Sequence, residues 1–233
     1  MLKVDFHLHS SEDPVDVITH SAHQLIDRAA ELGFDALALT LHDCDFRDTG
    51  LRAYASERGI VLVPGVERTI EGCHVLLINF HERTDHVRTF EDLAALRKES
   101  HGLVIAPHPY FPDRSCLRGR LDRYVDLFDA IEWSYFWTRG LNFNLQAARF
   151  AAAHGKPLVA SSDLHDIRQL GRTYSLVFAD PTPDAICAAI RAGQVTIHTT
   201  AVPKLELARV LGGMFRRGRK TPVRTESPTL ATT

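Results

Sequence analysis

Short apolar runs that alternate with helix-like segments limit the folds open to this chain more than any other feature. Such runs lie at residues 35–41, 60–67, 103–106, 130–133, 157–161, 174–178 and 195–198, and most of the segments between them carry apolar residues at helical spacing. A hairpin partner at 74–80 follows the turn signal Glu71-Gly72. Strands that alternate with helices favour a parallel α/β architecture, in which ligands bind at the carboxyl ends of the strands.

Imidazole and carboxylate side chains recur where these predicted strands end. The set comprises His7, His9, His42, Glu67, His108, Asp163 and His165, joined by His74 from the hairpin and Asp13 from the first loop. Any one of them alone also fits a helix cap or a backbone contact. Their recurrence at one end of many strands instead predicts a metal site, because divalent metals bind imidazole nitrogen and carboxylate oxygen. The set is too large for one ion and suits two or three.

His7 and His9 are separated by one residue at the end of the first apolar run. Side chains of a strand alternate between its faces, so both imidazoles project from the same side. A pair of solvated histidines on a surface strand is the alternative for this motif, since two residues carry little information by themselves. The remaining histidines lie on predicted helices, turns or other strand positions, and we assign them structural roles.

Composition and charge exclude several classes of protein. The chain has 233 residues, 45% of them hydrophobic, and its net charge of -2 argues against broad binding of extended nucleic acid through a basic surface. Its four cysteines are widely spaced, which predicts no disulfide framework and favours a reducing cytoplasm. It has no leader-like segment and no apolar run of the roughly 20 residues that span a membrane. We expect one domain over residues 1–211 and a basic, disordered tail over 212–233.

The motifs together resemble those of the PHP (polymerase and histidinol phosphatase) family over roughly residues 1–205. The matching segments are His7-Leu8-His9, Leu39-Thr40-Leu41-His42-Asp43, Pro64-Gly65-Val66-Glu67, His74-Val75-Leu76, Pro107-His108-Pro109 and Ser162-Asp163-Leu164-His165. The resemblance implies a distorted (β/α) barrel of seven strands and a trinuclear centre of zinc, manganese or iron at the carboxyl ends of the strands.

The resemblance also implies a ligand set for each ion. One ion would bind His7, His9, Glu67 and Asp163; a second would share Glu67 and add His74 and His108; a third would bind Asp13, His42 and His165. Glu12 and Asp16 remain alternatives to Asp13. Leu41 stands where the family commonly has an aspartate, which leaves the orientation of His42 in question.

A metal-bound hydroxide would then attack the phosphorus of a phosphate ester, and no protein nucleophile would be needed. Arg114, Arg139 and Arg168 are candidates for binding the phosphate, and aromatic residues near the first two would stack on a base or sugar or simply pack the loops. We predict a phosphoesterase that acts on a small phosphorylated metabolite or a nucleotide. Alternatives are a nuclease for short single-stranded oligonucleotides, a catalytically silent metal-binding domain, and a barrel amidohydrolase, which would need a bridging lysine.

Overall fold

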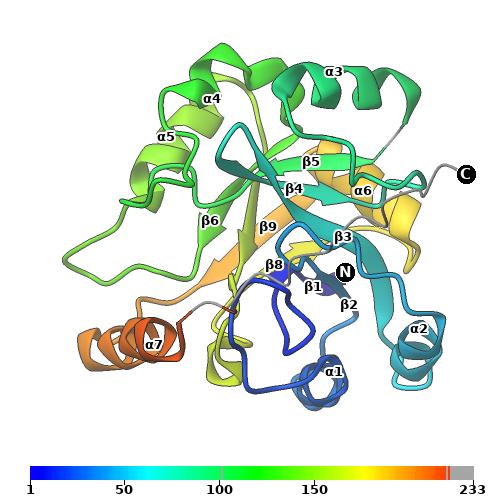
Figure 1. Ribbon diagram of the computed structural model, residues 1–233, viewed down its shortest axis with the longest axis vertical. Helices are drawn as coiled ribbons and strands as arrows, with labels where there is room; N and C mark the ends of the chain where they lie inside the picture. Colours follow the sequence, from blue (N-terminus) through cyan, green and yellow to red (C-terminus); the bar gives the residue numbers. More distant parts are fainter. Residues whose placement is uncertain (101, 219, 221–233) are drawn as a thin grey trace, which may run out of the picture.

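The computed structural model describes residues 1–100, 102–218 and 220 of the chain, with helices arranged around a strongly curved sheet (Figure 1). The strands are β1 Leu2–Leu8, β2 Ala36–Leu39, β3 Val61–Ile70, β4 Cys73–Ile78, β5 Leu103–Ala106, β6 Ala130–Ser134, β7 Leu158–Ser161, β8 Thr173–Val177 and β9 Val195–Thr199. The helices are α1 Ala22–Glu31, α2 Thr49–Ser56, α3 Phe90–Glu99, α4 Arg120–Arg123, α5 Asn144–Ala153, α6 Pro183–Arg191 and α7 Lys204–Arg217, with short 3-10 turns η1 Val125–Leu127 and η2 Ile167–Gln169.

The described residues form one sheet of nine strands in the order β7-β6-β5-β4-β3-β2-β1-β8-β9. The α/β class is therefore confirmed, and the count of seven strands is not. The pairs β1–β2, β2–β3, β5–β6 and β6–β7 are parallel. Beyond β1, an antiparallel pair, β8 and β9, extends the sheet. Six strands, β1 to β3 and β5 to β7, thus run in one direction and bring their carboxyl ends to the same edge.

The hairpin predicted around Glu71 and Gly72 is present between β3 and β4. Both turn residues have positive φ, 46° and 79°, as a two-residue type I′ turn requires. The register pairs Thr69 with His74, and Glu67 pairs with Leu76 two residues further along. His74 is therefore a diagonal neighbour of Glu67 on one face of the hairpin.

The sheet curves round until β7 lies beside β8, which makes it a nearly closed barrel. At this seam the hydroxyl of Ser175 accepts a hydrogen bond from the amide of Ala160 at 2.7 Å and donates one to its carbonyl at 3.0 Å. Nearby, the amide of His9 donates to the carbonyl of Leu164 at 3.1 Å. The seam therefore joins the ends of β1 and β7, although these strands are far apart in the sequence.

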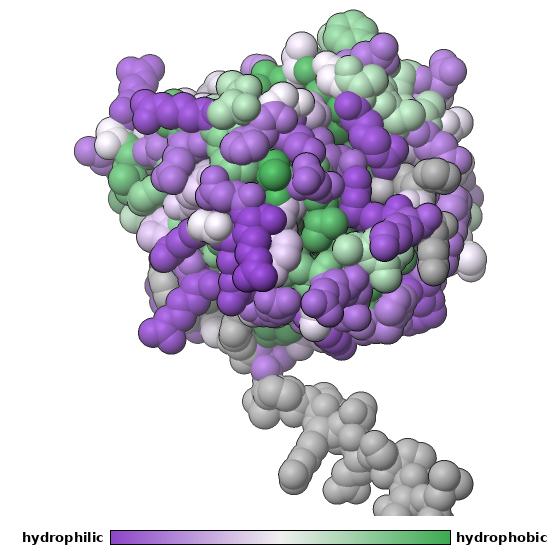
Figure 2. Space-filling view, turned by 90° about the horizontal axis from the view of Figure 1, so that it is seen from above, coloured by the Kyte–Doolittle hydropathy of each residue, from purple (hydrophilic) through white to green (hydrophobic). Residues whose placement is uncertain are grey.

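Apolar side chains on both sides of the sheet hold this arrangement together. One core cluster gathers residues from strands β1 to β8 and from α6, and two others lie between the sheet and the surrounding helices. No helix among the described residues is long and apolar enough to cross a membrane. The face seen in Figure 2 is mostly hydrophilic, with small hydrophobic areas between polar side chains.

Helix α7 crosses the domain boundary that we expected at residue 211. Residues 212–217 are therefore helical, and Leu207, Leu211 and Met214 pack against a cluster that contains Phe136 and Val202. The basic character of this segment concealed its apolar face. Residues 219 and 221–233 of the expected tail lie outside the described part of the chain.

Candidate metal centre

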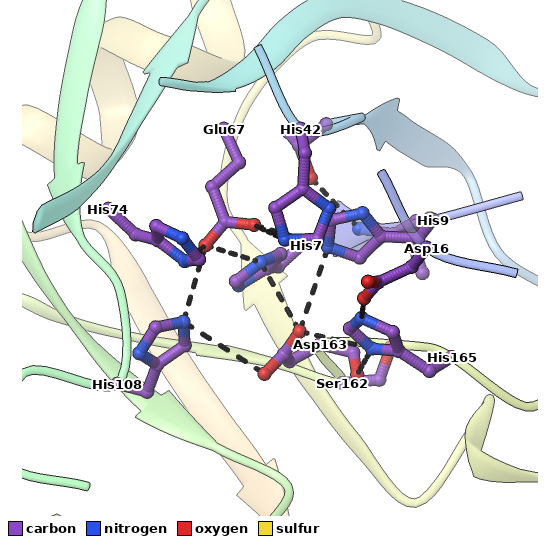
Figure 3. Close-up of polar contacts among 12 residues, drawn as sticks. His7, His9, Asp16, His42, Glu67, His74, His108, Ser162, Asp163 and His165 are labelled. Atoms are coloured by element: carbon purple, nitrogen blue, oxygen red, sulfur yellow. Dashed lines mark hydrogen bonds and ion pairs between the residues drawn. The ribbon is translucent and has the colours of Figure 1, made fainter. Parts of the chain in front are cut away.

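His7 and His9, at the end of β1, are completely buried and direct their Nε2 atoms at two carboxylates (Figure 3). Nε2 of His7 lies 3.4 Å from Oε1 of Glu67 and 3.4 Å from Oδ1 of Asp163. Nε2 of His9 lies 3.4 Å and 3.7 Å from the same two carboxylates. Neither Nε2 atom has a hydrogen-bond partner among the described residues. Buried polar atoms rarely lack a partner, so this placement fits nitrogen atoms that bind a cation.

The carboxylate of Glu67 reaches three further imidazoles from neighbouring strand ends. Its Oε1 lies 2.7 Å from Nδ1 of His74 and 3.3 Å from Nε2 of His108. Its Oε2 lies 3.2 Å from Nε2 of His42. A carboxylate with a different set of nitrogen atoms at each oxygen is suited to bridge two ions.

His42, His165 and Asp16 form the third side of the cluster. The rings of His42 and His165 lie against that of His9, with centroid distances of 4.4 Å and 4.5 Å respectively. Nε2 of His165 is 3.1 Å from Oδ2 of Asp16. His9, His42 and His165 also present nitrogen atoms close enough together to hold one ion. The nine predicted residues therefore converge, except that an aspartate of the first loop has a different place from the one expected.

Asp13 lies behind the imidazoles, on their Nδ1 side. Its Oδ2 accepts hydrogen bonds from Nδ1 of His9 and Nδ1 of His42, each at 2.9 Å, and from the backbone amide of His42 at 2.9 Å. The assignment of Asp13 as a direct ligand is therefore revised, since its oxygen atoms are already used. Glu12 faces the start of α1 and accepts from the amide of Ala22 at 3.1 Å, so Asp16 is the acid of this loop that lines the cavity.

The position of Asp13 also answers the question raised by Leu41. Nδ1 of His42 needs an acceptor that fixes the tautomer and the ring orientation, and Asp13 supplies one from another loop. The imidazole is thereby held with Nε2 towards Glu67, whatever residue precedes it in the sequence.

Glu132 is a further member of the site that the sequence analysis missed. This fully buried acid of β6 accepts from Nδ1 of His7 at 2.9 Å and from the backbone amide of His108 at 2.7 Å. The available signal was an acidic residue inside the apolar run Ala130–Ser134, where a charge is costly unless it has a defined partner. Cys116 also contributes, with Sγ 3.4 Å from Nδ1 of His108.

Two residues of the site depend on an uncommon backbone conformation. His108 and Asp163 follow β5 and β7 with φ values of 27° and 46°. Residues other than glycine rarely adopt positive φ, because the β-carbon then crowds the backbone. The sharp turns that result direct the two side chains across the strand ends towards Glu67 (Figure 3).

Burial disfavours the charged forms of the residues in this cluster, whereas attraction between imidazoles and carboxylates favours them. Burial disfavours the cationic form of His7, but nearby carboxylates, Asp163 foremost, raise its pKa well above the usual value. Burial likewise disfavours ionised Glu67, but neighbouring imidazoles, His74 foremost, hold its pKa well below the usual value. Burial also opposes ionisation of Asp163, but His7, His165 and His108 together lower its pKa to about 2. His9 differs, since burial and adjacent imidazoles both lower its pKa.

The cluster opens into a cavity of about 540 Å³. Of the three arginines proposed to bind phosphate, Arg114 lines this cavity, whereas Arg139 and Arg168 are exposed and lie outside its lining. Nη2 of Arg168 forms an ion pair of 2.7 Å with Asp166. Of the aromatic loop residues, Phe111 and Phe136 reach the cavity.

Comparisons with known proteins agree with this geometry. A family model described as PHP-associated matches residues 142–195. A two-domain protein from Bacteroides vulgatus that contains a predicted PHP-like metal-dependent phosphoesterase has a similar fold, with 20% identity and a TM-score of 0.61 over 91% of this chain and 69% of that one. The match to the PHP-associated model and this likeness of fold both support the PHP resemblance seen in the sequence.

Other proteins of known structure have folds that are similar to this one to a comparable degree. The lesion-specific endonuclease EndoQ from Pyrococcus furiosus has 19% identity and a TM-score of 0.58, over 84% of this chain and 57% of that one. An amidohydrolase from Chromobacterium violaceum with bound sulfate has 16% identity and a TM-score of 0.56, over 96% and 99%. At these identities the likeness concerns the fold. No curated protein sequence matches the chain.

The donor atoms of this site fit divalent metal ions. Among the described residues, four groups of three present ligand atoms within 4.8 Å of one another; three combine imidazole with carboxylate, and the fourth consists of three imidazoles. Nitrogen and oxygen donors of this kind suit borderline cations such as zinc, manganese and ferrous iron. The unpartnered Nε2 atoms of His7 and His9 meet the same requirement, because a metal ligand must offer a free lone pair.

Proposed function

We propose that this chain is a metal-dependent phosphoesterase that hydrolyses a phosphate ester of a small metabolite or a nucleotide. The observation that carries the proposal is the convergence of two buried, unpartnered imidazole nitrogens on the carboxylates of Glu67 and Asp163. The two carboxylates line a cavity of about 540 Å³, within the usual size range for small-molecule sites. The four cysteines are free thiols, which supports our placement of the protein in a reducing cytoplasm.

We assign the ligands to three ion positions. The first is formed by His7, His9, Glu67 and Asp163. The second shares Glu67 and adds His74 and His108. The third takes His42 and His165, with Asp16 in the place that we first assigned to Asp13, since Asp16 contacts His165 and lines the cavity.

Bound ions of this kind supply a hydroxide nucleophile near neutral pH and neutralise the oxygen atoms of the phosphate. The residues of the chain prepare the site for this chemistry. Asp13 and Glu132 accept hydrogen bonds from Nδ1 atoms, which aims the opposite Nε2 atoms at the site, where a metal ion would displace any proton they carry. The guanidinium of Arg114, at the edge of the cavity, neutralises a phosphate or a second anionic group of the substrate.

The residues that line the cavity also bear on the alternative functions. An amidohydrolase with a bridging lysine is disfavoured, because the described residues that line the cavity include no lysine. A nuclease and a silent metal-binding domain are distinguished from a small-molecule phosphoesterase by which substrates the protein hydrolyses.

The test is phosphate release from a panel of monoesters, mononucleotides and short oligonucleotides by protein loaded with Mn²⁺. We expect hydrolysis of small esters by the unmodified protein and a loss of at least a hundredfold in His7→Ala. His81→Ala, which changes an exposed histidine away from the cavity, is the matched control and keeps full activity. Cleavage of oligonucleotides alone would establish the nuclease reading. Metal binding without hydrolysis of any member of the panel would establish the silent domain.

A further inference from the structure

The cavity above the metal ligands has two unlike sides. One side consists of the imidazoles and carboxylates described above. The other includes four apolar side chains: Phe111 after β5, Phe136 after β6, and Leu211 and Met214 of α7. We call these four residues the apolar subsite.

The apolar subsite packs on a buried cluster on one side and faces the cavity on the other. Phe136 is 6% exposed and belongs to a buried cluster with Tyr135, Val202 and Val210. Phe111, Leu211 and Met214 pack on that cluster while remaining partly exposed, and the rings of Phe111 and Phe136 lie 5.8 Å apart. Exposure of apolar surface to water is unfavourable in free energy. An apolar ligand group that covers this surface therefore binds favourably.

Helix α7 is fixed in place near both of its ends, so this side of the cavity is preformed. Near its start, Glu206 accepts hydrogen bonds from Nη2 of Arg172 at 2.9 Å and 3.1 Å and from the hydroxyl of Tyr135 at 3.1 Å. Just after its end, the carbonyl of Gly218 accepts from the amide of Val17 at 3.4 Å. A preformed surface binds its ligand without the entropic cost of ordering.

We infer that the substrate carries a flat apolar group, aryl or heteroaryl, which binds the apolar subsite while the phosphate lies at the metal ligands. The inference rests on the proposed phosphoesterase function. Two phenyl rings and a thioether offer the stacking and sulfur contacts that favour an aromatic partner over a polyol. Arg114 lines the same cavity, so its guanidinium is placed to bind the anionic end of such a ligand.

The test uses two phosphonates, because their carbon–phosphorus bond does not hydrolyse and binding is measured apart from turnover. Benzylphosphonate and 2-hydroxyethylphosphonate share the anionic head and differ in the organic group. Calorimetry on Mn²⁺-loaded protein should show benzylphosphonate binding about tenfold more tightly. The double variant Leu211→Ser/Met214→Ser should lose most of that preference and keep its affinity for 2-hydroxyethylphosphonate within about twofold.

Leu205→Ser is the matched control, since Leu205 lies on the same helix and is 65% exposed. It should bind both phosphonates as the unmodified protein does, and all variants should hold equal amounts of metal. Equal affinity of the unmodified protein for the two phosphonates would overturn the inference even if the double variant failed to fold. An equal loss of both ligands in the double variant would also overturn it. Phosphate release measured on the same samples separates the two claims: preference without hydrolysis of any ester refutes only the proposed function, and hydrolysis without preference refutes only the apolar subsite.

Discussion

Two buried carboxylate clusters in this molecule balance their charge in opposite ways. Asp129, at the amino end of β6, accepts two hydrogen bonds from the guanidinium of Arg97 at 2.7 Å and 2.9 Å, and its Oδ1 lies 3.4 Å from Nε of Arg191. Glu67 and Asp163 face imidazoles only, and the Nε2 atom of His7 between them has no hydrogen-bond partner among the described residues.

The difference separates a structural ion pair from a binding site. A guanidinium is permanently charged, so the Asp129 cluster is complete within the chain. An imidazole carries a positive charge only while it holds a proton, and that proton leaves when a metal ion takes the lone pair. The carboxylates of the metal centre are therefore compensated in a way that an external cation can replace.

The largest effect on the metal centre is expected from Glu67→Gln, which removes one negative charge at nearly constant side-chain shape. The variant should lose about a thousandfold or more of its activity, because the bridging ligand organises more than one ion. Bound metal measured by mass spectrometry should fall, and added Mn²⁺ should no longer raise the melting temperature. Retention of full metal content and activity would contradict the assignment of Glu67.

The same chemical change at the other cluster, Asp129→Asn, should act on stability alone. Loss of a buried, hydrogen-bonded partner of Arg97 should lower the free energy of unfolding by about 2–3 kcal/mol in urea titrations. Metal content and activity per folded molecule should be unchanged. A loss of metal in this variant would show that the two clusters are coupled.

The pH dependence of that stability difference follows from the pKa of Asp129. Burial opposes its ionisation, but hydrogen bonds from Arg97 and from the amide of Val104 hold its pKa below the usual value. A lowered pKa in the folded state contributes stability above the unfolded value of about 4 and loses it as the pH falls towards the folded value. The advantage of the unmodified protein over Asp129→Asn, measured without metal, should be constant from pH 6 to 8 and shrink below about pH 4. An advantage that persists at pH 3 would refute the ion-pair explanation.

Asp13→Asn tests whether an acid that contacts no ion directly still controls the metal centre. An amide accepts hydrogen bonds from the Nδ1 atoms of His9 and His42 less strongly than a carboxylate does, so the imidazoles become less firmly oriented. Affinity for Mn²⁺ should fall about 10–100-fold. Glu12→Gln, in the same loop but directed at α1, is the matched control and should change affinity little. Equal effects of the two substitutions would remove the case for Asp13.

The smallest expected effect is that of Lys220→Ala. The ammonium of Lys220 donates to the carbonyls of Ser11 and Asp13 at 2.9 Å and 2.6 Å and so ties the chain after α7 to the loop that carries Asp16. Loss of these partly exposed hydrogen bonds should weaken Mn²⁺ binding about threefold. Lys156→Ala, on the turn after α5, should leave the affinity unchanged. An unchanged affinity in Lys220→Ala would show that the loop keeps its place without this contact.

The sequence predicted where the strands lie better than it predicted how many of them join the barrel sheet. The apolar runs, followed one by one, include every strand of the final sheet, and the count of seven came from the family resemblance. The runs that became β8 and β9 were recognised, but pairing partners depend on how the sheet curves, and local periodicity does not report this. Helix α7 was missed because Arg216 and Arg217 drew attention to charge, while the apolar residues that pack it are spaced along one face.

At the site, chemistry was predictable and geometry was not. Strand ends revealed His7, Glu67 and Asp163, since the carboxyl edge of a parallel sheet gathers whatever follows each strand. Direct ligands could not be told from supporting residues, because Asp13 and Asp16 differ in role only through the path of one loop. Glu132 escaped notice for a similar reason, since a single acid in an apolar run does not reveal which imidazole it supports.

The positive φ angles of His108 and Asp163 bear on how this protein would respond to engineering. Each such backbone conformation costs about 1–2 kcal/mol in a residue with a β-carbon, and glycine would avoid most of that cost. A campaign that selects variants by melting temperature in metal-free buffer would therefore favour glycine at both positions and discard two ligands in the process. Thermostabilisation of this scaffold should be screened with metal present, so that gains from a relaxed backbone are weighed against the cation that the strained one binds.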